Sequence, residues 1–310
     1  MKLRSKLSIH FRKFPNVTIK LFDTLIKPIL LYASDFWGIL KLPKNNPFET
    51  LFHSFCKKLL GVQKQTTNIG VLLELGLVPL NLYAKKNALK NWNRIAKLRK
   101  ANSLVFTSYQ NALAQKLSWP AQTKLLLSNI GMLDNFFSNI RDTNNHIKIY
   151  QRLHDIFHQN AFAEINEPNS KLRTYKHLKT KNGIEEYLNI IPCQKERVSL
   201  SKFRLSNHSL MIEKGRHNNV PIDLRLCPLC ENRVEDEVHF LITCEAFKNQ
   251  REKLFSRIGV SNSNHFKYSN NLEKFKFLLT NRDTIKIVAQ YIRQNLQHRE
   301  DIIEGLVTIG

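Results

Sequence analysis

Four side chains that could bind a metal ion lie close together in the stretch CPLCENRVEDEVHFLITC, residues 227–244. They follow the spacing C-x2-C-x8-H-x4-C and are Cys227, Cys230, His239 and Cys244. Thiolate sulfur and imidazole nitrogen are ligands that zinc prefers, and four of them complete a tetrahedral shell without an open position for water. The sequence therefore predicts one structural zinc ion rather than a catalytic one.

The alternative is a set of buried thiols beside a hydrogen-bonded histidine. The chain has only 5 cysteines, and the clustering of three of them favours a metal site in a reducing compartment over disulfides. The spacing also poses a geometric difficulty. His239 and Cys244 are five residues apart, which is roughly 140° around an ideal α-helix. They can share an ion only if the helix ends or tightens between them.

Basic residues outnumber acidic ones by 48 to 25, which gives the chain a net charge of +23. The excess is greatest in residues 1–100, and no acid lies between Leu75 and Leu133. Such an imbalance predicts a polyanionic partner, RNA or DNA, with an anionic membrane surface as the competing partner. The metal-binding stretch is itself acidic at Glu235, Asp236 and Glu237. We therefore expect it to hold its neighbours in place rather than to bind phosphate.

The residues expected to contact nucleic acid lie in two parts of the chain. In a predicted helix over residues 79–100, one face carries Lys86, Lys90, Arg94 and Lys97. The opposite face carries Ala84, Ala88, Trp92 and Ile95. Because this part of the chain lacks acids, the basic face could contact phosphates, the alternative being an ordinary solvated face. The second group precedes the metal-binding stretch and comprises Lys202, Arg204, Arg216 and Arg225.

Apolar residues recur at spacings of three and four through most of the chain, which is typical of helices. We expect a mainly α protein, an elongated multi-helix bundle with a small Cys3His zinc clip near its C-terminal third. A long apolar helix is expected over residues 17–40, bent at Pro28. The expected divisions are a basic helical region at 1–165, a linker at 166–183, a zinc-binding segment at 184–262 and C-terminal helices at 263–310.

The sequence predicts neither a membrane span nor a secretory signal. The longest apolar run, residues 26–40, is too short to span a bilayer and contains Pro28 and Asp35. The start, MKLRSKLSIHFRKF, is basic and lacks an apolar signal core. We expect a nuclear or cytoplasmic protein, and an acid-free start leaves a mitochondrial transit peptide as the alternative.

Residues 199–247, SLSKFRLSNHSLMIEKGRHNNVPIDLRLCPLCENRVEDEVHFLITCEAF, resemble the zinc-binding segment at the C-terminal end of reverse transcriptases from non-LTR, LINE-like retrotransposons. The likeness lies in the metal-ligand spacing, in the preceding LSKFRLSNHSLMIEKGR and in the Glu-Asp-Glu run before the histidine. Two further stretches, LFDTLIKPILLYASDFWG and FHSFCKKLLGVQKQTTNIGVLLELGLVPL, resemble the thumb and connection region of the same elements.

The resemblance implies a zinc-containing, nucleic-acid-binding C-terminal fragment of an RNA-directed DNA polymerase, with other parts of a reverse transcriptase as further partners. The polymerase needs two adjacent aspartates to hold two metal ions. This chain has no such pair, and Tyr32-Ala33-Ser34-Asp35 supplies one aspartate in a predicted helix, where we expect core packing. We therefore expect no catalytic residue and no enzyme activity. The alternative is a domesticated helical protein-interaction module with a structural zinc.

Overall fold

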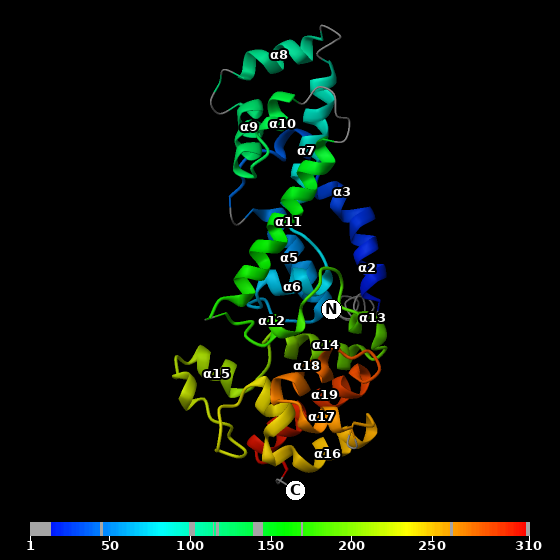
Figure 1. Cartoon of the computed structure of the whole chain (residues 1–310), viewed down its shortest axis with the longest axis vertical. Coiled ribbons are helices and arrows are strands. Elements are labelled where there is room, and N and C mark those ends of the chain that lie inside the picture. The colour runs from blue at the N-terminus through cyan, green and yellow to red at the C-terminus, as the bar shows by residue number, and fades with distance from the viewer. Residues whose placement is uncertain are drawn as a thin grey trace, which may run out of the picture. The chain divides into compact units, whose positions relative to one another are not determined.

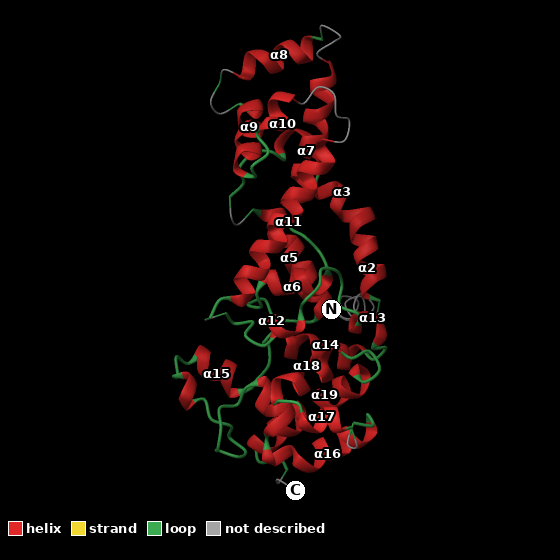
Figure 2. Ribbon diagram, viewed as in Figure 1, coloured by secondary structure: helices red, strands yellow, loops and turns green. Residues whose placement is uncertain are grey.

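A computed structural model of the chain describes residues 14–43, 46–98, 103–113, 115, 118–138, 145–168, 170–260 and 263–307. The protein is mainly helical, as predicted (Figures 1 and 2). Within these ranges there is no strand, only an isolated antiparallel bridge between Leu226 and Val234. No helix in them combines the length and apolar character needed to cross a membrane. The basic start considered as a transit peptide lies almost entirely outside the described residues.

The chain divides into two compact units, and each is assembled from separate stretches of sequence. Unit 1 comprises Met1–Thr18, Phe55–Gly76 and Glu164–Gly310, and unit 2 comprises Ile19–Ser54 and Leu77–Ala163. This division differs from the predicted order of consecutive domains. In particular, the zinc-binding segment and the C-terminal helices, which we predicted as separate regions, belong to one unit.

The segment at 166–183 is part of unit 1 and not a linker. It contains the short helix α12 (Tyr175–Leu178), and Leu172 and Tyr175 are buried. Lys179 is also buried, and its Nζ lies 2.8 Å from Glu185 Oε1. Three basic residues of this segment, Lys171, Arg173 and Lys179, form ion pairs inside the unit.

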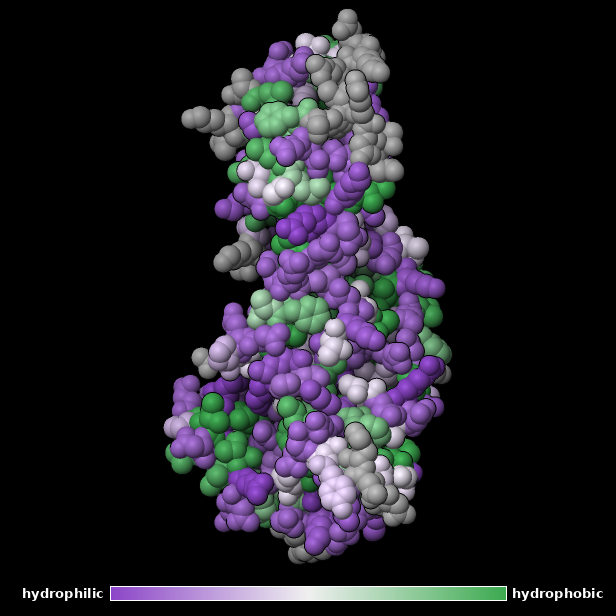
Figure 3. All heavy atoms as spheres, viewed as in Figure 1, coloured by the Kyte–Doolittle hydropathy of each residue, from purple (hydrophilic) through white to green (hydrophobic). Residues whose placement is uncertain are grey.

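The helix expected over residues 17–40 is interrupted. α2 (Pro15–Leu21) continues into a π-helical turn, η1 (Phe22–Ile26), directly before α3 (Lys27–Leu30). A π-turn inserts an extra residue, and such turns occur where a helix is disturbed, here next to Pro28. In Figure 3 hydrophobic residues gather along the edge where Figure 1 places α2 and α3.

The motif Tyr32-Ala33-Ser34-Asp35 lies at a turn rather than within a helix. Ala33 has a φ of 55°, in the left-handed region, and α4 (Ser34–Trp37) begins after it. Only Ser34 of the four is buried, whereas Tyr32 is 81% exposed. The prediction of core packing is therefore wrong for Tyr32.

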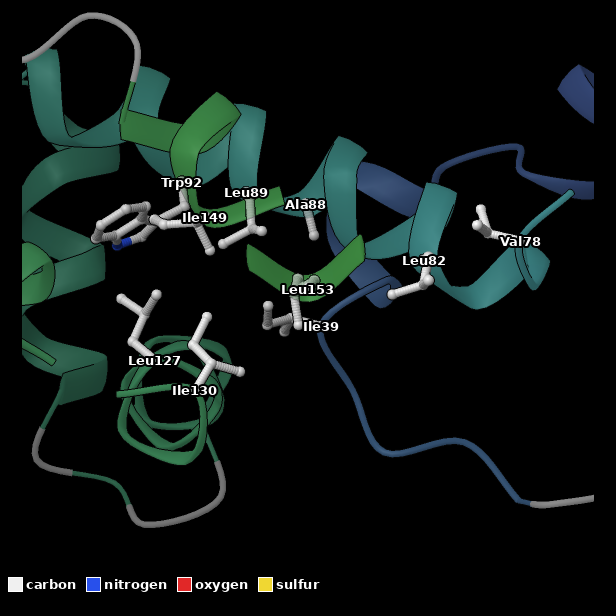
Figure 4. Packing of buried hydrophobic residues seen from close by; sticks show 10 residues of the cluster. All are labelled: Ile39, Val78, Leu82, Ala88, Leu89, Trp92, Leu127, Ile130, Ile149 and Leu153. Carbon is white, nitrogen blue, oxygen red and sulfur yellow. The ribbon is translucent and has the colours of Figure 1, made fainter. Parts of the chain in front are cut away.

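The core of unit 2 forms where α7 (Leu80–Lys97) meets α9 (Trp119–Asn129) and α11 (Asn145–Asn166), as Figure 4 shows. Trp92 is buried in this cluster, and its indole N–H donates to the hydroxyl of Tyr109 at 3.0 Å. Tyr109 belongs to α8 (Leu104–Leu113). The apolar face predicted for α7 is confirmed, because Ala84, Ala88, Trp92 and Ile95 are all buried.

Unit 1 holds the metal-ligand residues and the helices around them. α6 (Asn68–Leu75) ends at Gly76, whose φ of 64° needs the conformational freedom of glycine. The other helices of eight or more residues lying wholly in this unit are α14 (Gln194–Arg204), α16 (Lys248–Arg257), α18 (Asn271–Thr280) and α19 (Ile285–Ile303). α14 packs against α19. α14 and the shorter α15 (Met211–His217) both precede the metal-ligand residues in the sequence.

Candidate metal centre

The four predicted metal ligands converge. One ligand atom from each of Cys227, Cys230, His239 and Cys244 lies within 4.8 Å of all the others. The Sγ atoms of Cys227 and Cys244 are 3.9 Å apart, and Cys230 Sγ lies 3.4 Å from His239 Nε2. Tetrahedral zinc places two sulfur ligands roughly 3.8 Å apart, and a sulfur and a nitrogen ligand roughly 3.6 Å apart. The observed spacings suit such an ion.

A tight turn brings the first two cysteines together. The N–H of Glu231 donates to the carbonyl of Cys227 at 2.8 Å, and the N–H of Cys227 donates to the carbonyl of Arg233 at 2.9 Å. Glu231 has a φ of 54°, which reverses the chain directly after Cys230. The bridge between Leu226 and Val234 closes the loop. Both thiols can therefore reach one ion.

A π-helical turn removes the geometric difficulty between His239 and Cys244. The turn is η4 (His239–Thr243), and the N–H of Cys244 donates to the carbonyl of His239 at 2.8 Å. This bond joins residues five apart, as π-helices do. The helix ends at Cys244, as one of our two options required, but the turn before it widens rather than tightens.

Neighbouring groups orient two of the ligands. His239 Nδ1 lies 3.2 Å from Thr243 Oγ1, so a proton on Nδ1 leaves Nε2 available to a metal. The guanidinium of Arg251, which is buried, donates to the carbonyl of Cys244 at 2.8 Å. A divalent metal ion bound by three thiolates and a neutral histidine would carry a net charge of about −1. Arg251 is therefore placed to compensate that charge.

The thiols differ in environment. Cys227 and Cys244 are each 1% exposed, while Cys230 is partly exposed. The hydrogen bond with Cys244, together with burial, raises the pKa of the Cys227 thiol to about 12. The same hydrogen bond lowers the pKa of Cys244. A bound cation must displace the thiol protons, so its affinity falls as the pH falls.

In the acidic run before His239, Glu235 and Glu237 are buried and paired with distant basic residues. The carboxylate of Glu235 accepts hydrogen bonds from Nε and Nη2 of Arg299, each at 2.5 Å, and from the N–H of Met211 at 2.7 Å. Asp236 Oδ1 accepts the N–H of His239 at 2.6 Å, which caps the π-helical turn. The acidic run therefore fixes the position of the metal-binding stretch.

Glu237 is fully buried and has three partners. It accepts hydrogen bonds from Arg173 Nη2 at 2.7 Å and from Ser206 Oγ at 3.1 Å, and it contacts His208 Nε2 at 2.9 Å. Burial alone would raise the pKa of Glu237. The hydrogen bond and charge of His208 and the charge of Arg173 outweigh it and hold this pKa at about 2. Sequence reasoning missed Arg173 and Arg299 because each lies far along the chain from its carboxylate.

The basic face predicted for α7 is present. Lys86, Lys90, Arg94 and Lys97 are exposed. None of the four forms an ion pair with a residue that the structure describes, although Arg94 donates to Asn91 Oδ1 at 2.9 Å. A pocket of about 540 Å³ adjoins this face, and its lining includes Lys90, Arg94, Lys97 and one acid, Asp35, which forms no ion pair with them.

Arg204, predicted to contact nucleic acid, is instead a core residue. It is 1% exposed, with Nε 2.7 Å from Glu74 Oε1 and Nη2 2.5 Å from Glu185 Oε2. Its guanidinium also donates to the carbonyl of Leu279 at 3.0 Å. A phosphate has no access to this guanidinium, so the prediction that Arg204 contacts nucleic acid is wrong.

The other three residues of that group keep some exposure. Lys202 is half-buried and lines a groove in unit 1. Arg216 pairs with Glu213 at 3.0 Å. Arg225 donates to the carbonyls of Val220 and Ile212, each at 2.9 Å, and so supports the local backbone. Of the three, only Lys202 makes no side-chain hydrogen bond or ion pair with a described residue.

Comparisons of the chain with models of protein families, with curated proteins and with solved structures find no match. Support for a function therefore comes from the residues themselves. They provide a group of four ligands at tetrahedral spacing and an exposed basic helix face.

Proposed function

We propose that the chain is a zinc-containing, nucleic-acid-binding C-terminal region of a non-LTR retrotransposon reverse transcriptase. The binding activity is supported above all by α7, whose four exposed cations are not neutralised by any acid in the described residues. By contrast, the buried Arg204 and Arg299 each contact a carboxylate. The family is supported by the resemblance of residues 199–247 and of the two earlier stretches.

The metal proposed for the centre is zinc. Three thiolates and one imidazole at tetrahedral spacing form a ligand set that zinc prefers over magnesium or calcium, which take oxygen ligands. Because the protein supplies all four ligands, the ion would stabilise the fold of unit 1 rather than activate water.

The proposed function is tested by binding of labelled RNA and DNA to the full chain across a salt series. Lys90→Glu/Arg94→Glu should weaken binding and reduce the slope of log affinity against log salt, because each lost phosphate contact removes about 0.9 from that slope on duplex DNA. Lys248→Glu/Lys253→Glu is the matched control, since both lysines are exposed on α16 and the charge change is the same. Equal affinities for the two variants would exclude α7 as the binding face. No binding by the unmodified chain would exclude the function.

One observation favours the protein-interaction module as a second candidate. Leu25, Ile29 and Phe36 are 61%, 71% and 62% exposed along α3 and its neighbours, and exposed apolar groups of this kind mark interfaces. Binding through them would persist at high salt, unlike phosphate binding. Leu25→Glu/Ile29→Glu should then abolish partner binding while leaving nucleic-acid affinity unchanged.

A further inference from the structure

A second basic surface lies within unit 1, in a groove of about 980 Å³ lined by residues of α14, α15 and α19. Each helix contributes cationic or titratable side chains: Lys195 and Lys202 from α14, Lys214 and His217 from α15, and Arg293 from α19. The positive charge is therefore spread over all three walls, rather than along one helix as in α7.

Three of these cations are not neutralised. Lys195, Lys202 and Arg293 form no ion pair with any residue in the described ranges, whereas Lys214 lies 3.3 Å from Glu300. Three carboxylates also line the groove: Glu213 is engaged by Arg173 at 2.7 Å, Glu300 by Arg299 at 2.6 Å, and Asp301 Oδ1 accepts the amide of Gln297 at 2.8 Å. The groove thus has unpaired positive charge on the walls formed by α14 and α19.

Amide side chains lie between the charges. Gln194 and Gln294 line the groove from α14 and α19, and Gln297 adds a third amide one turn further along α19. Such amides donate and accept hydrogen bonds, as the edges of nucleic-acid bases require. The lining suits a ligand that combines phosphates with polar ring edges.

The metal-binding stretch connects the walls of this groove. Glu235, four residues before His239, accepts the N–H of Met211 at the start of α15 and the guanidinium of Arg299 in α19. Glu237 contacts Ser206 and His208, which follow α14. Loss of the metal would release both glutamates and so loosen the arrangement of all three helices.

We propose that this groove binds a single nucleic-acid strand and that the metal ion maintains the groove through Glu235 and Glu237. The inference rests on the proposed function and deepens it by adding a second contact with a defined class of ligand. Cations of α14 and α19 would neutralise the phosphates of a strand that lies in the groove. The amides could bond the Watson–Crick edges of bases, which are free only in unpaired strands.

The test measures the affinity of the full chain for a labelled single strand and for a duplex of equal length, by fluorescence anisotropy across a salt series. Lys195→Glu/Lys202→Glu should weaken single-strand binding by roughly tenfold and lower the salt slope by about 1.4, the value for two lost phosphate contacts on a single strand. The control is again Lys248→Glu/Lys253→Glu. Circular dichroism verifies that both variants remain folded.

A second arm removes the metal with a chelator. The unmodified chain should lose single-strand affinity to the level of Lys195→Glu/Lys202→Glu, and that variant should lose little more. Unchanged affinity after verified metal loss would overturn the dependence on metal. Equal behaviour of Lys195→Glu/Lys202→Glu and its control would overturn the groove while leaving α7 in place. A preference for duplex that depends on Lys195 and Lys202 would overturn the single-strand assignment. Absence of all nucleic-acid binding would instead overturn the proposed function and this inference with it.

Discussion

Arg299 and Glu235 form a buried bidentate ion pair that joins α19 to the metal-binding stretch. Both nitrogen–oxygen distances are 2.5 Å, and the two residues are 0% and 1% exposed. Glu235 Oε1 also lies 3.7 Å from Cys227 Sγ. The carboxylate of Glu235 therefore links α19, the last long helix of unit 1, to Cys227, one of the four candidate metal ligands.

Replacing Arg299 with Met should strongly destabilise unit 1. The change leaves Glu235 buried without its partner, and loss of one member of a buried ion pair costs about 3–5 kcal/mol. Urea unfolding followed by circular dichroism measures the change. Arg299→Met/Glu235→Gln removes both charges and should recover part of the loss. A single variant as stable as the unmodified chain would show that the pair contributes nothing net.

Cys230→Ser should abolish stoichiometric metal binding and expose residues 227–258 to proteolysis, because the proposed ion would link the turn at Cys230 to the π-helical turn. Zinc per chain and limited proteolysis measure the two effects. Cys193→Ser is the control, since Cys193 lies outside the group of four ligands. Nucleic-acid binding through α7 should persist. Unchanged protection of residues 227–258 would contradict the expected role of the ion.

Arg204→Met should affect stability and not the intrinsic affinity for nucleic acid. Glu74 is fully buried beside Arg204, so the variant would leave its charge uncompensated at a cost of about 3–5 kcal/mol. Urea unfolding and anisotropy on the folded fraction separate the two effects. A stable variant with weakened binding would instead indicate that Arg204 contacts phosphate.

Glu49→Gln should change how the stability of unit 2 depends on pH. Burial raises the pKa of Glu49, although the N–H of Asn81 donates to its Oε1 at 2.6 Å and opposes the shift. The folded chain therefore holds this proton more tightly than the unfolded chain. The stabilisation is complete below the ordinary pKa of 4.5 and is lost as the pH rises through the raised value.

The measurement for Glu49 is the free energy of unfolding from about pH 4 to pH 7. The difference between the unmodified chain and Glu49→Gln should shift in favour of the unmodified chain as the pH falls. A constant difference over this range would show that Glu49 titrates alike in the folded and unfolded chains.

The sequence was sufficient to predict those features that local spacing determines. Four ligands within one short stretch were found from their types and intervals, and the two faces of α7 followed from the helical period. The widened turn after His239 could not be predicted in the same way. Its hydrogen bond skips one residue more than an α-helix does, and no residue type specifies that choice.

The partners in buried ion pairs could not be predicted from the sequence, because they depend on tertiary structure. Arg204 meets Glu74 across 130 residues of sequence, and Arg299 meets Glu235 across 64. One local signal was available for Arg204. It shares a helix face with Leu200 and Arg197, which are also buried, whereas Lys195 and Lys202 share another face. An apolar residue between two arginines on one face indicates burial of that face.

The interleaved composition of the two units has a consequence during synthesis. Unit 2 is complete once Ala163 has been made, so it can fold while the ribosome is still translating. Glu74 is synthesised before its ion-pair partner Arg204, and the interval between them is roughly ten seconds at ordinary elongation rates. Until then α6 lacks its contacts with later residues such as Leu172 and Leu205, which lie against Gly70. Exposure of the apolar residues of α6 during this interval would favour association of stalled or shortened translation products.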